Sequence, residues 1–109
     1  MPQTQEVWAD VFIELLPTEK GGRKIPLDLC NDNPGQYRPH FRVIGGSGEL
    51  LGVSFMDGPD DPVLPGACTN ATVKWLYAPA VSYAELLEGA KFEILEGPNV
   101  VGYGTVTQR

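Results

Sequence analysis

The sequence predicts an all-β protein whose six antiparallel strands close into a small barrel. Short apolar runs alternate with polar residues, a period typical of strands that bury one face. The 13 glycines and 10 prolines lie between these runs and favour turns. At 109 residues the chain has the size of one domain, expected over residues 1–109. Strands with a single apolar face bury that face when the sheet closes on itself.

The first strand is expected at residues 6–16, where the alternation is clearest. Its inward positions are all apolar: Val7, Ala9, Val11, Ile13 and Leu15. Its outward positions carry acidic residues, but Trp8 and Phe12 share that polar face. Aromatic side chains at alternate outward positions are typical of a protein-binding patch. Cover by the long segment 17–36, which is too rich in proline and glycine for a regular element, is the other interpretation.

The remaining strands are expected in order along the chain, with turn signals between them. Their ranges are residues 37–44, 49–56, 68–77, 90–95 and 100–108. Alternation places Trp75 in the core and leaves Trp8 exposed. Gly102 and Gly104 should mark a bend, or a close approach of another backbone. One helical turn is expected at 82–88, because Ser82 and Glu85 have capping-box spacing.

Charge and targeting signals limit the partners and the compartment. The formal net charge of −6 disfavours generic binding to phosphate backbones and anionic membrane surfaces. No apolar stretch has the length of a membrane span, and the start of the chain lacks a signal pattern. We therefore expect a cytoplasmic protein, in which Cys30 and Cys68 are reduced thiols rather than a disulfide.

Polar residues in the middle of the chain give no pattern typical of an active site. His40 is the only histidine, and no Gly-x-Ser-x-Gly turn accompanies it. Arg38 and Arg42, outward on the second strand, are expected to pair with Asp10 or Glu14 if the first strand is adjacent.

A metal site of His40, Cys30 and Cys68 lacks any known ligand spacing. The acidic loop 57–62 lacks the spacing of a calcium loop. Neither a catalytic residue nor a metal or cofactor is expected.

Several landmarks, taken in order, make the chain resemble the C-terminal (third) domain of elongation factor Tu and related translational GTPases. The early landmarks are Gly21-Gly22-Arg23, Tyr37-Arg38-Pro39 and Leu64-Pro65-Gly66. The late ones are Gly89-Ala90-Lys91-Phe92-Glu93-Ile94, Glu96-Gly97 and Val101-Gly102-Tyr103-Gly104. The resemblance runs from about Val7 to the end and implies a six-stranded antiparallel barrel. No Gly-x-x-x-x-Gly-Lys-Ser/Thr loop is present, so nucleotide binding is not expected.

In that family, the loop after the first strand and the Glu-Gly pair of the last hairpin touch the T-stem backbone of aminoacyl-tRNA. The resemblance therefore implies an RNA contact by Arg23, Glu96 and Gly97. Lys24 stands where elongation factor Tu usually has histidine.

The function that these observations favour is a non-enzymatic binding module that acts through protein contacts, with a link to translation or its regulation. A tRNA- or RNA-binding protein that uses the Arg23 loop is the alternative, with weak affinity expected. A small hydrolase or metal enzyme is the least favoured class.

Overall fold

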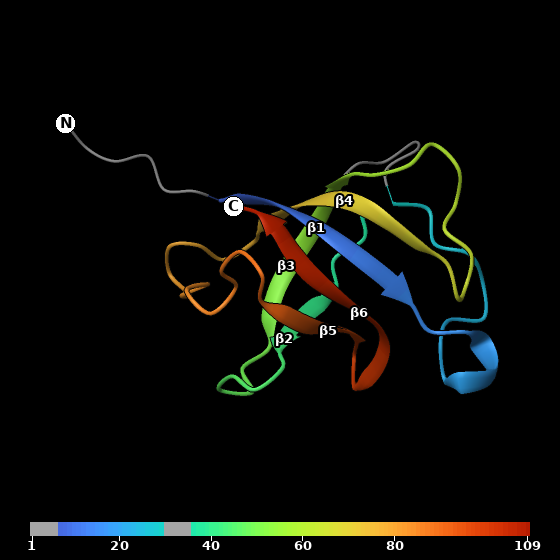
Figure 1. Ribbon diagram of the computed structural model, residues 1–109. Helices are drawn as coiled ribbons and strands as arrows, with labels where there is room; N and C mark the ends of the chain where they lie inside the picture. Colours follow the sequence, from blue (N-terminus) through green and yellow to red (C-terminus); the bar gives the residue numbers. More distant parts are fainter. Residues whose placement is uncertain (1–6, 30–35) are drawn as a thin grey trace.

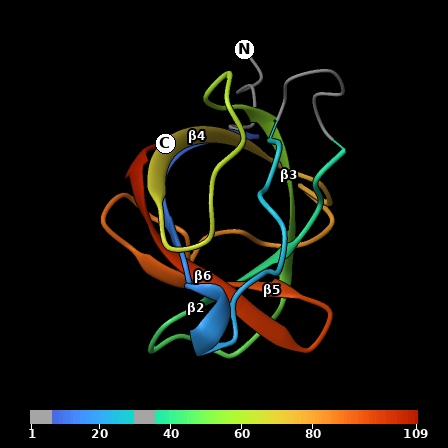
Figure 2. The same ribbon diagram turned by 90° about the vertical axis from the view of Figure 1, so that its right-hand side faces the viewer.

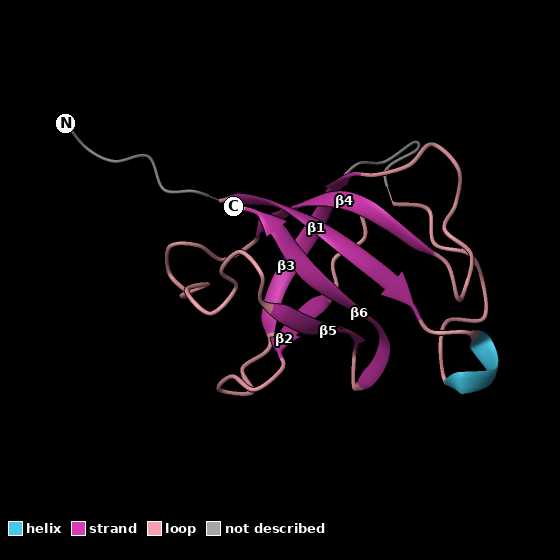
Figure 3. Cartoon of the chain, viewed as in Figure 1, coloured by secondary structure: helices cyan, strands magenta, loops and turns pink. Residues whose placement is uncertain are grey.

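The computed structural model describes residues 7–29 and 36–109, and strands dominate it (Figure 3). In chain order the elements are β1 (Trp8–Leu15), the 3₁₀ helix η1 (Thr18–Lys20), β2 (His40–Val43), β3 (Leu51–Asp57), β4 (Cys68–Trp75), β5 (Lys91–Glu96) and β6 (Asn99–Gln108). No helix in these described ranges has the length and apolar character needed to cross a membrane.

The strands form the closed antiparallel barrel that the sequence predicts. Hydrogen-bonded neighbours follow the order β1-β4-β3-β2-β5-β6, and β6 pairs with β1 to complete the circle. Figure 1 shows β1 between β4 and β6, and Figure 2 shows the strands around a common centre. Closure removes the unpaired edges that an open sheet of this size would expose.

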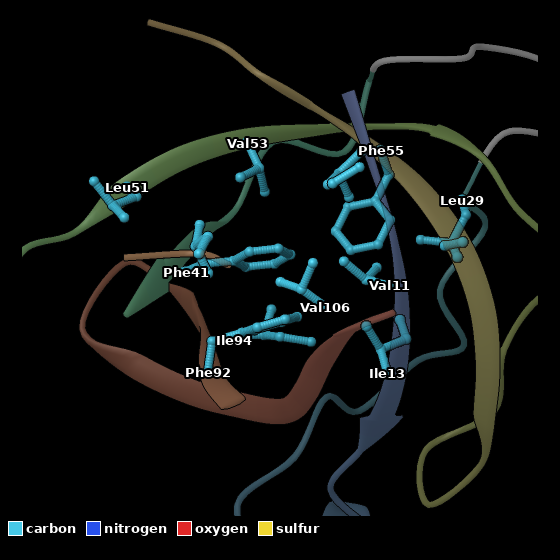
Figure 4. Packing of buried hydrophobic residues seen from close by; sticks show 14 of the residues in the cluster. Val11, Ile13, Leu29, Phe41, Leu51, Val53, Phe55, Phe92, Ile94 and Val106 are labelled. Carbon is cyan, nitrogen blue, oxygen red and sulfur yellow. The ribbon is translucent and has the colours of Figure 1, made fainter. Parts of the chain in front are cut away.

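Apolar side chains from all around the barrel fill its interior. Figure 4 shows Val11 and Ile13 pointing toward the phenylalanines of the other strands. Phe41 stacks on Phe92 with 3.9 Å between ring centroids, and Phe55 meets Phe41 edge-on at 5.9 Å. The strict alternation of buried and exposed residues along β1 explains this filling, since every second side chain points inward.

Two tryptophans occupy opposite faces, as the alternation predicts. Trp75 is 1% exposed and stacks on Tyr83, whereas Trp8 is 43% exposed. The segment after η1 also contributes to the core, because Leu27 and Leu29 are buried and Leu27 pairs with Val63 in an isolated bridge. The described part of this segment therefore closes the interior and does not cover the outward rings of β1.

The second strand is shorter than predicted, since β2 begins at His40 rather than at Tyr37. Proline has no backbone N–H, so Pro39 interrupts the ladder. The carbonyls of Tyr37 and Pro39 nevertheless accept hydrogen bonds from Phe55 and Val53 of β3, at 3.0 and 3.1 Å. The preceding residues thus run beside β3 without counting as a strand. The other strand ends differ from the predicted ones by about one or two residues; Glu6 lies outside the described residues.

The helical turn predicted at residues 82–88 is wrong. Ser82 Oγ accepts a hydrogen bond from the N–H of Ala84. Glu85 does not cap this segment; its carboxylate accepts from the N–H and the Oγ of Ser47 at 3.0 and 3.1 Å. Tyr83 and Leu86 are buried, and the Tyr83 hydroxyl donates to the Gly52 carbonyl at 2.6 Å. Tertiary contacts therefore override the local capping signal.

The predicted ion pairs of the second strand also need correction. Because β1 is not a neighbour of β2, neither Asp10 nor Glu14 pairs with Arg42. Arg42 Nε instead donates to Glu93 Oε1 on β5 at 2.7 Å, between residues in direct register. The alternation placed Arg42 on the correct face, but the strand order decided its partner.

The close approach of another backbone that was predicted at Gly102 and Gly104 is confirmed. A Cβ at Gly102 would lie 2.6 Å from the Glu14 carbonyl oxygen. One at Gly104 would lie 2.5 Å from Phe92 Cζ and 2.8 Å from the Phe12 carbonyl oxygen. Neither position has room for a side chain, so β6 can pass tightly over Phe92 and beside β1.

Candidate functional site

The loop that carries Arg23 takes its shape from two glycines with different roles. Gly21 ends η1 in the left-handed conformation, with φ of 93°, where glycine carries no steric cost. A Cβ at Gly22 would lie 2.0 Å from the Leu16 carbonyl oxygen, so only glycine fits there. The Thr18 hydroxyl then donates to the Arg23 carbonyl at 2.6 Å. These constraints turn the Arg23 side chain back toward the barrel.

Arg23, Tyr37 and Glu96 meet in one cluster, which we call the arginine cluster. Arg23 Nη1 and the Tyr37 hydroxyl both donate to Glu96 Oε2, the latter at 2.6 Å. The Arg23 guanidinium carbon also lies 5.6 Å from the centroid of the Tyr37 ring. Three segments that are distant in sequence are therefore joined at one carboxylate oxygen.

The arginine cluster is internally satisfied. Its ion pair is mostly shielded from solvent, with side-chain exposures of 16% for Arg23 and 32% for Glu96. Burial, followed by the hydrogen bond to Glu96, raises the pKa of Tyr37 well above its usual range. Because Glu96 neutralises Arg23, the guanidinium offers little net charge to an outside anion. The arrangement is suited to holding the Arg23 loop, the segment that precedes β2 and the last hairpin together.

The neighbouring residues complete the sequence-predicted RNA site. Gly97, exposed and with φ of 58°, makes the tight turn between β5 and β6 directly after Glu96. Lys24 is exposed beside Arg23. The structure thus joins Arg23 to Glu96, which Gly97 follows in the chain, and Lys24 is an exposed cation next to Arg23.

The outer face of β1 carries a second candidate site. Trp8 and Phe12 point outward, and Phe12 is 40% exposed. Tyr103 of β6 joins them at 41% exposure, because Glu14 and Tyr103 are in direct register. Sequence analysis missed Tyr103 as a binding residue. Its position between Gly102 and Gly104 in the sequence was the available signal.

A groove of about 490 Å³ lies along this face, between β1 and β5 and across β6. We call it the aromatic groove; its lining includes Phe12, Glu14, Ile44, Lys91, Tyr103 and Gly104. Gly104 contributes its backbone to this lining, since the Cβ that it lacks would point inward, toward Phe92. Exposed aromatic rings around a depression are a common feature of protein-binding surfaces.

Two residues considered for a metal site, His40 and Cys68, lie on strands that are not neighbours. His40 is half-buried on β2, opposite Gly52 and Leu95. Cys68 is exposed on β4, while Cys30 lies outside the described residues. Within residues 7–29 and 36–109, no three His, Cys, Asp or Glu side chains are grouped so that they could hold a metal ion. In a scan against protein-family models, no family matches the chain.

Proposed function

We propose that this chain is a non-enzymatic binding module of the cytoplasm, which acts through contacts with a protein partner in translation or its regulation. The aromatic groove is the observation that carries the proposal. Its two rings, Phe12 and Tyr103, are about two-fifths exposed on a barrel whose interior is already filled. The link to translation rests on the resemblance of the landmarks to the third domain of elongation factor Tu.

The energetics favour a protein ligand on this face. Aromatic side chains are enriched at interface centres, because they bury a large area and lose little conformational entropy. Phe12 and Tyr103 sit on adjacent strands of a closed sheet, so their backbone positions are fixed before binding. A rigid surface of this kind binds without a large ordering cost.

Affinity capture from a lysate of the source organism tests this function. The bait is wild-type protein or the double variant Phe12→Thr/Tyr103→Thr, and threonine keeps the strand propensity. A matched control, Leu64→Thr/Leu87→Thr, removes two apolar side chains that are 60% and 62% exposed outside the groove. We expect a protein captured by wild type and by the control, but lost with the groove variant. Capture that is equal for all three baits would overturn the proposal.

RNA binding through the Arg23 loop is the second candidate, and the contact between Arg23 and Glu96 is the observation that favours it. The two segments implied by the resemblance lie side by side, although Glu96 neutralises one of the two cations. One remaining phosphate contact by Lys24 would give a slope of only about −0.9 in log affinity against log salt. We therefore expect weak binding.

Titration of labelled aminoacyl-tRNA with wild type and Lys24→Ala decides between the two candidates. Lys24→Ala is preferable to Arg23→Ala, because it removes a cation without opening the arginine cluster. Micromolar or tighter binding at moderate salt that Lys24→Ala abolishes would make RNA binding the leading function.

A further inference from the structure

The outward face of β1 alternates between aromatic rings and carboxylates. Its residues in order are Trp8, Asp10, Phe12 and Glu14. Residues two apart on a strand are separated by about 7 Å. An apolar surface and a negative charge therefore repeat along β1, which lies in the middle of this face between β4 and β6 (Figure 1).

A second depression, which we call the acidic hollow, lies beside the aromatic groove. It has a volume of about 320 Å³, and Asp10, Asp57, Asn70 and Thr72 contribute to its lining. Among its lining residues, the two aspartates are the charged ones. The Thr72 hydroxyl donates to Asp10 Oδ1 at 2.8 Å, which fixes the position of that carboxylate.

Phe12 separates the two depressions. It lines the aromatic groove, and it is in register with Thr105 of β6 on one side and with Asn70 of β4 on the other. Asn70 in turn lines the acidic hollow. A ligand that crosses Phe12 would thus have an apolar site and an acidic site in adjacent positions.

We propose that the partner binds through a basic and apolar protein segment, with an apolar side chain in the aromatic groove and a lysine or arginine in the acidic hollow. This inference rests on the proposed function and adds the chemistry of the partner. The cation would be attracted by the carboxylates of Asp10 and Asp57, with its aliphatic stem against Phe12. Within the chain, the ammonium of Lys74 already lies 6.0 Å from the centroid of the Trp8 ring.

Charge complementarity selects this partner over the other occupants of such a face. A second copy of the chain would bring its own net charge of −6 against the same carboxylates. Nucleic acid would meet the same repulsion. Two cations lie near this face: Lys74 stands over Trp8, and Lys91 lines the aromatic groove together with the carboxylate of Glu14. Neither lysine lines the acidic hollow, where the cation of the partner would bind.

The test uses two fluorescein-labelled peptides and fluorescence anisotropy with the full chain. The first peptide repeats the sequence Leu-Ser-Lys-Ser, so that leucine and lysine take turns at every second position. The second peptide has glutamate in place of every lysine. The charge variant is Asp10→Asn/Asp57→Asn. The asparagine at position 10 can still accept the hydrogen bond that the Thr72 hydroxyl donates. Its matched control, Glu19→Gln/Glu88→Gln, changes the net charge equally at two exposed sites outside both depressions.

We expect the lysine peptide to bind more tightly than the glutamate peptide. We expect Asp10→Asn/Asp57→Asn to weaken it about fivefold to tenfold, whereas the control stays within about twofold. Phe12→Thr/Tyr103→Thr should abolish the binding.

Equal binding of the two peptides, equal effects of the two charge variants, no binding at all, or insensitivity to the groove variant would each overturn the inference. The proposed function has a separate readout. If the captured protein depends on Phe12 and Tyr103 but not on Asp10 and Asp57, the binding module stands and the basic partner does not.

Discussion

The arginine cluster and the outer face of β1 both combine aromatic and charged side chains, but they use them in opposite ways. In the cluster, Arg23, Tyr37 and Glu96 satisfy one another and are largely shielded. On β1, Trp8 and Phe12 remain about two-fifths exposed and have carboxylates between and beyond them. The comparison teaches that a motif rich in functional residue types can be used up in internal contacts, while a strand without such a motif leaves its aromatic rings exposed.

A side chain introduced at Gly104, where β6 passes closely over Phe92, should have the largest effect on stability. Gly104→Val would place its Cβ only 2.5 Å from Phe92 Cζ and 2.8 Å from the Phe12 carbonyl oxygen. We expect a loss of about 2–3 kcal/mol in the free energy of unfolding. Urea unfolding followed by tryptophan fluorescence measures it. The neighbouring outward substitution Thr105→Val should stay within about 0.5 kcal/mol; a similar loss there would show that the strand, not the close contact, is responsible.

Opening the arginine cluster should have the next largest effect. Arg23→Ala leaves a partly shielded Glu96 with Tyr37 as its remaining donor in the cluster, and should cost about 1–2 kcal/mol. A double-mutant cycle of Arg23→Ala with Glu96→Gln should give a coupling energy of about 1 kcal/mol. The matched cycle on Arg42 and Glu93, whose arginine side chain is 36% exposed, should give less than about 0.5 kcal/mol. Equal coupling in the two cycles would contradict the structural role given to the cluster.

The alternation of apolar residues was sufficient to predict the barrel, because each strand buries one face and the pattern repeats every second residue. It placed Trp75 inside and Trp8 outside for the same reason. What alternation cannot predict is which strands are neighbours. The pairing of Arg42 with Asp10 or Glu14 was expected only if the first strand lay beside the second, and its actual partner, Glu93, depends on β5 lying beside β2.

The candidate sites show the same division between local and long-range information. Arg23, Glu96 and Gly97 came from a resemblance, but their mutual contact depends on Tyr37 and on the space missing at Gly22. Neither feature can be read from residue types alone. The capping signal at Ser82 failed similarly, because Glu85 had a better partner in the hairpin around Ser47.

The hydroxyl of Tyr37 offers a finer test of the cluster. Tyr37→Phe removes the hydrogen bond to Glu96 and should cost about 1 kcal/mol at neutral pH. Because the pKa of Tyr37 is raised in the folded state, its hydroxyl stays protonated after an unfolded tyrosine, with a pKa of about 10, has ionised. Above that pH the unfolded state binds fewer protons, so the stability of the wild type falls as the pH rises.

Tyr37→Phe should therefore make this alkaline loss of stability shallower, and urea midpoints on either side of the tyrosine pKa measure the slope. Part of the slope should remain, since burial also raises the pKa of Tyr83. An unchanged slope in Tyr37→Phe would mean that its hydroxyl does not stay shielded in the folded protein.

The smallest effect on stability is expected at the residue with the largest role in the proposed binding. Phe12→Thr removes a ring that is already 40% exposed and keeps a β-branched residue on the strand, so the free energy of unfolding should fall by only about 0.5 kcal/mol. The buried counterpart Phe41→Thr, at 0% exposure, should lose about 3 kcal/mol or more.

Urea unfolding compares the two variants, and partner capture is measured on Phe12→Thr under the same conditions. A stability loss at Phe12 close to that at Phe41 would make the ring part of the packing, and any loss of capture would then reflect unfolding. A stable Phe12→Thr that loses its partner would instead separate the two regions fully, with the arginine cluster holding the fold and the face of β1 binding the partner.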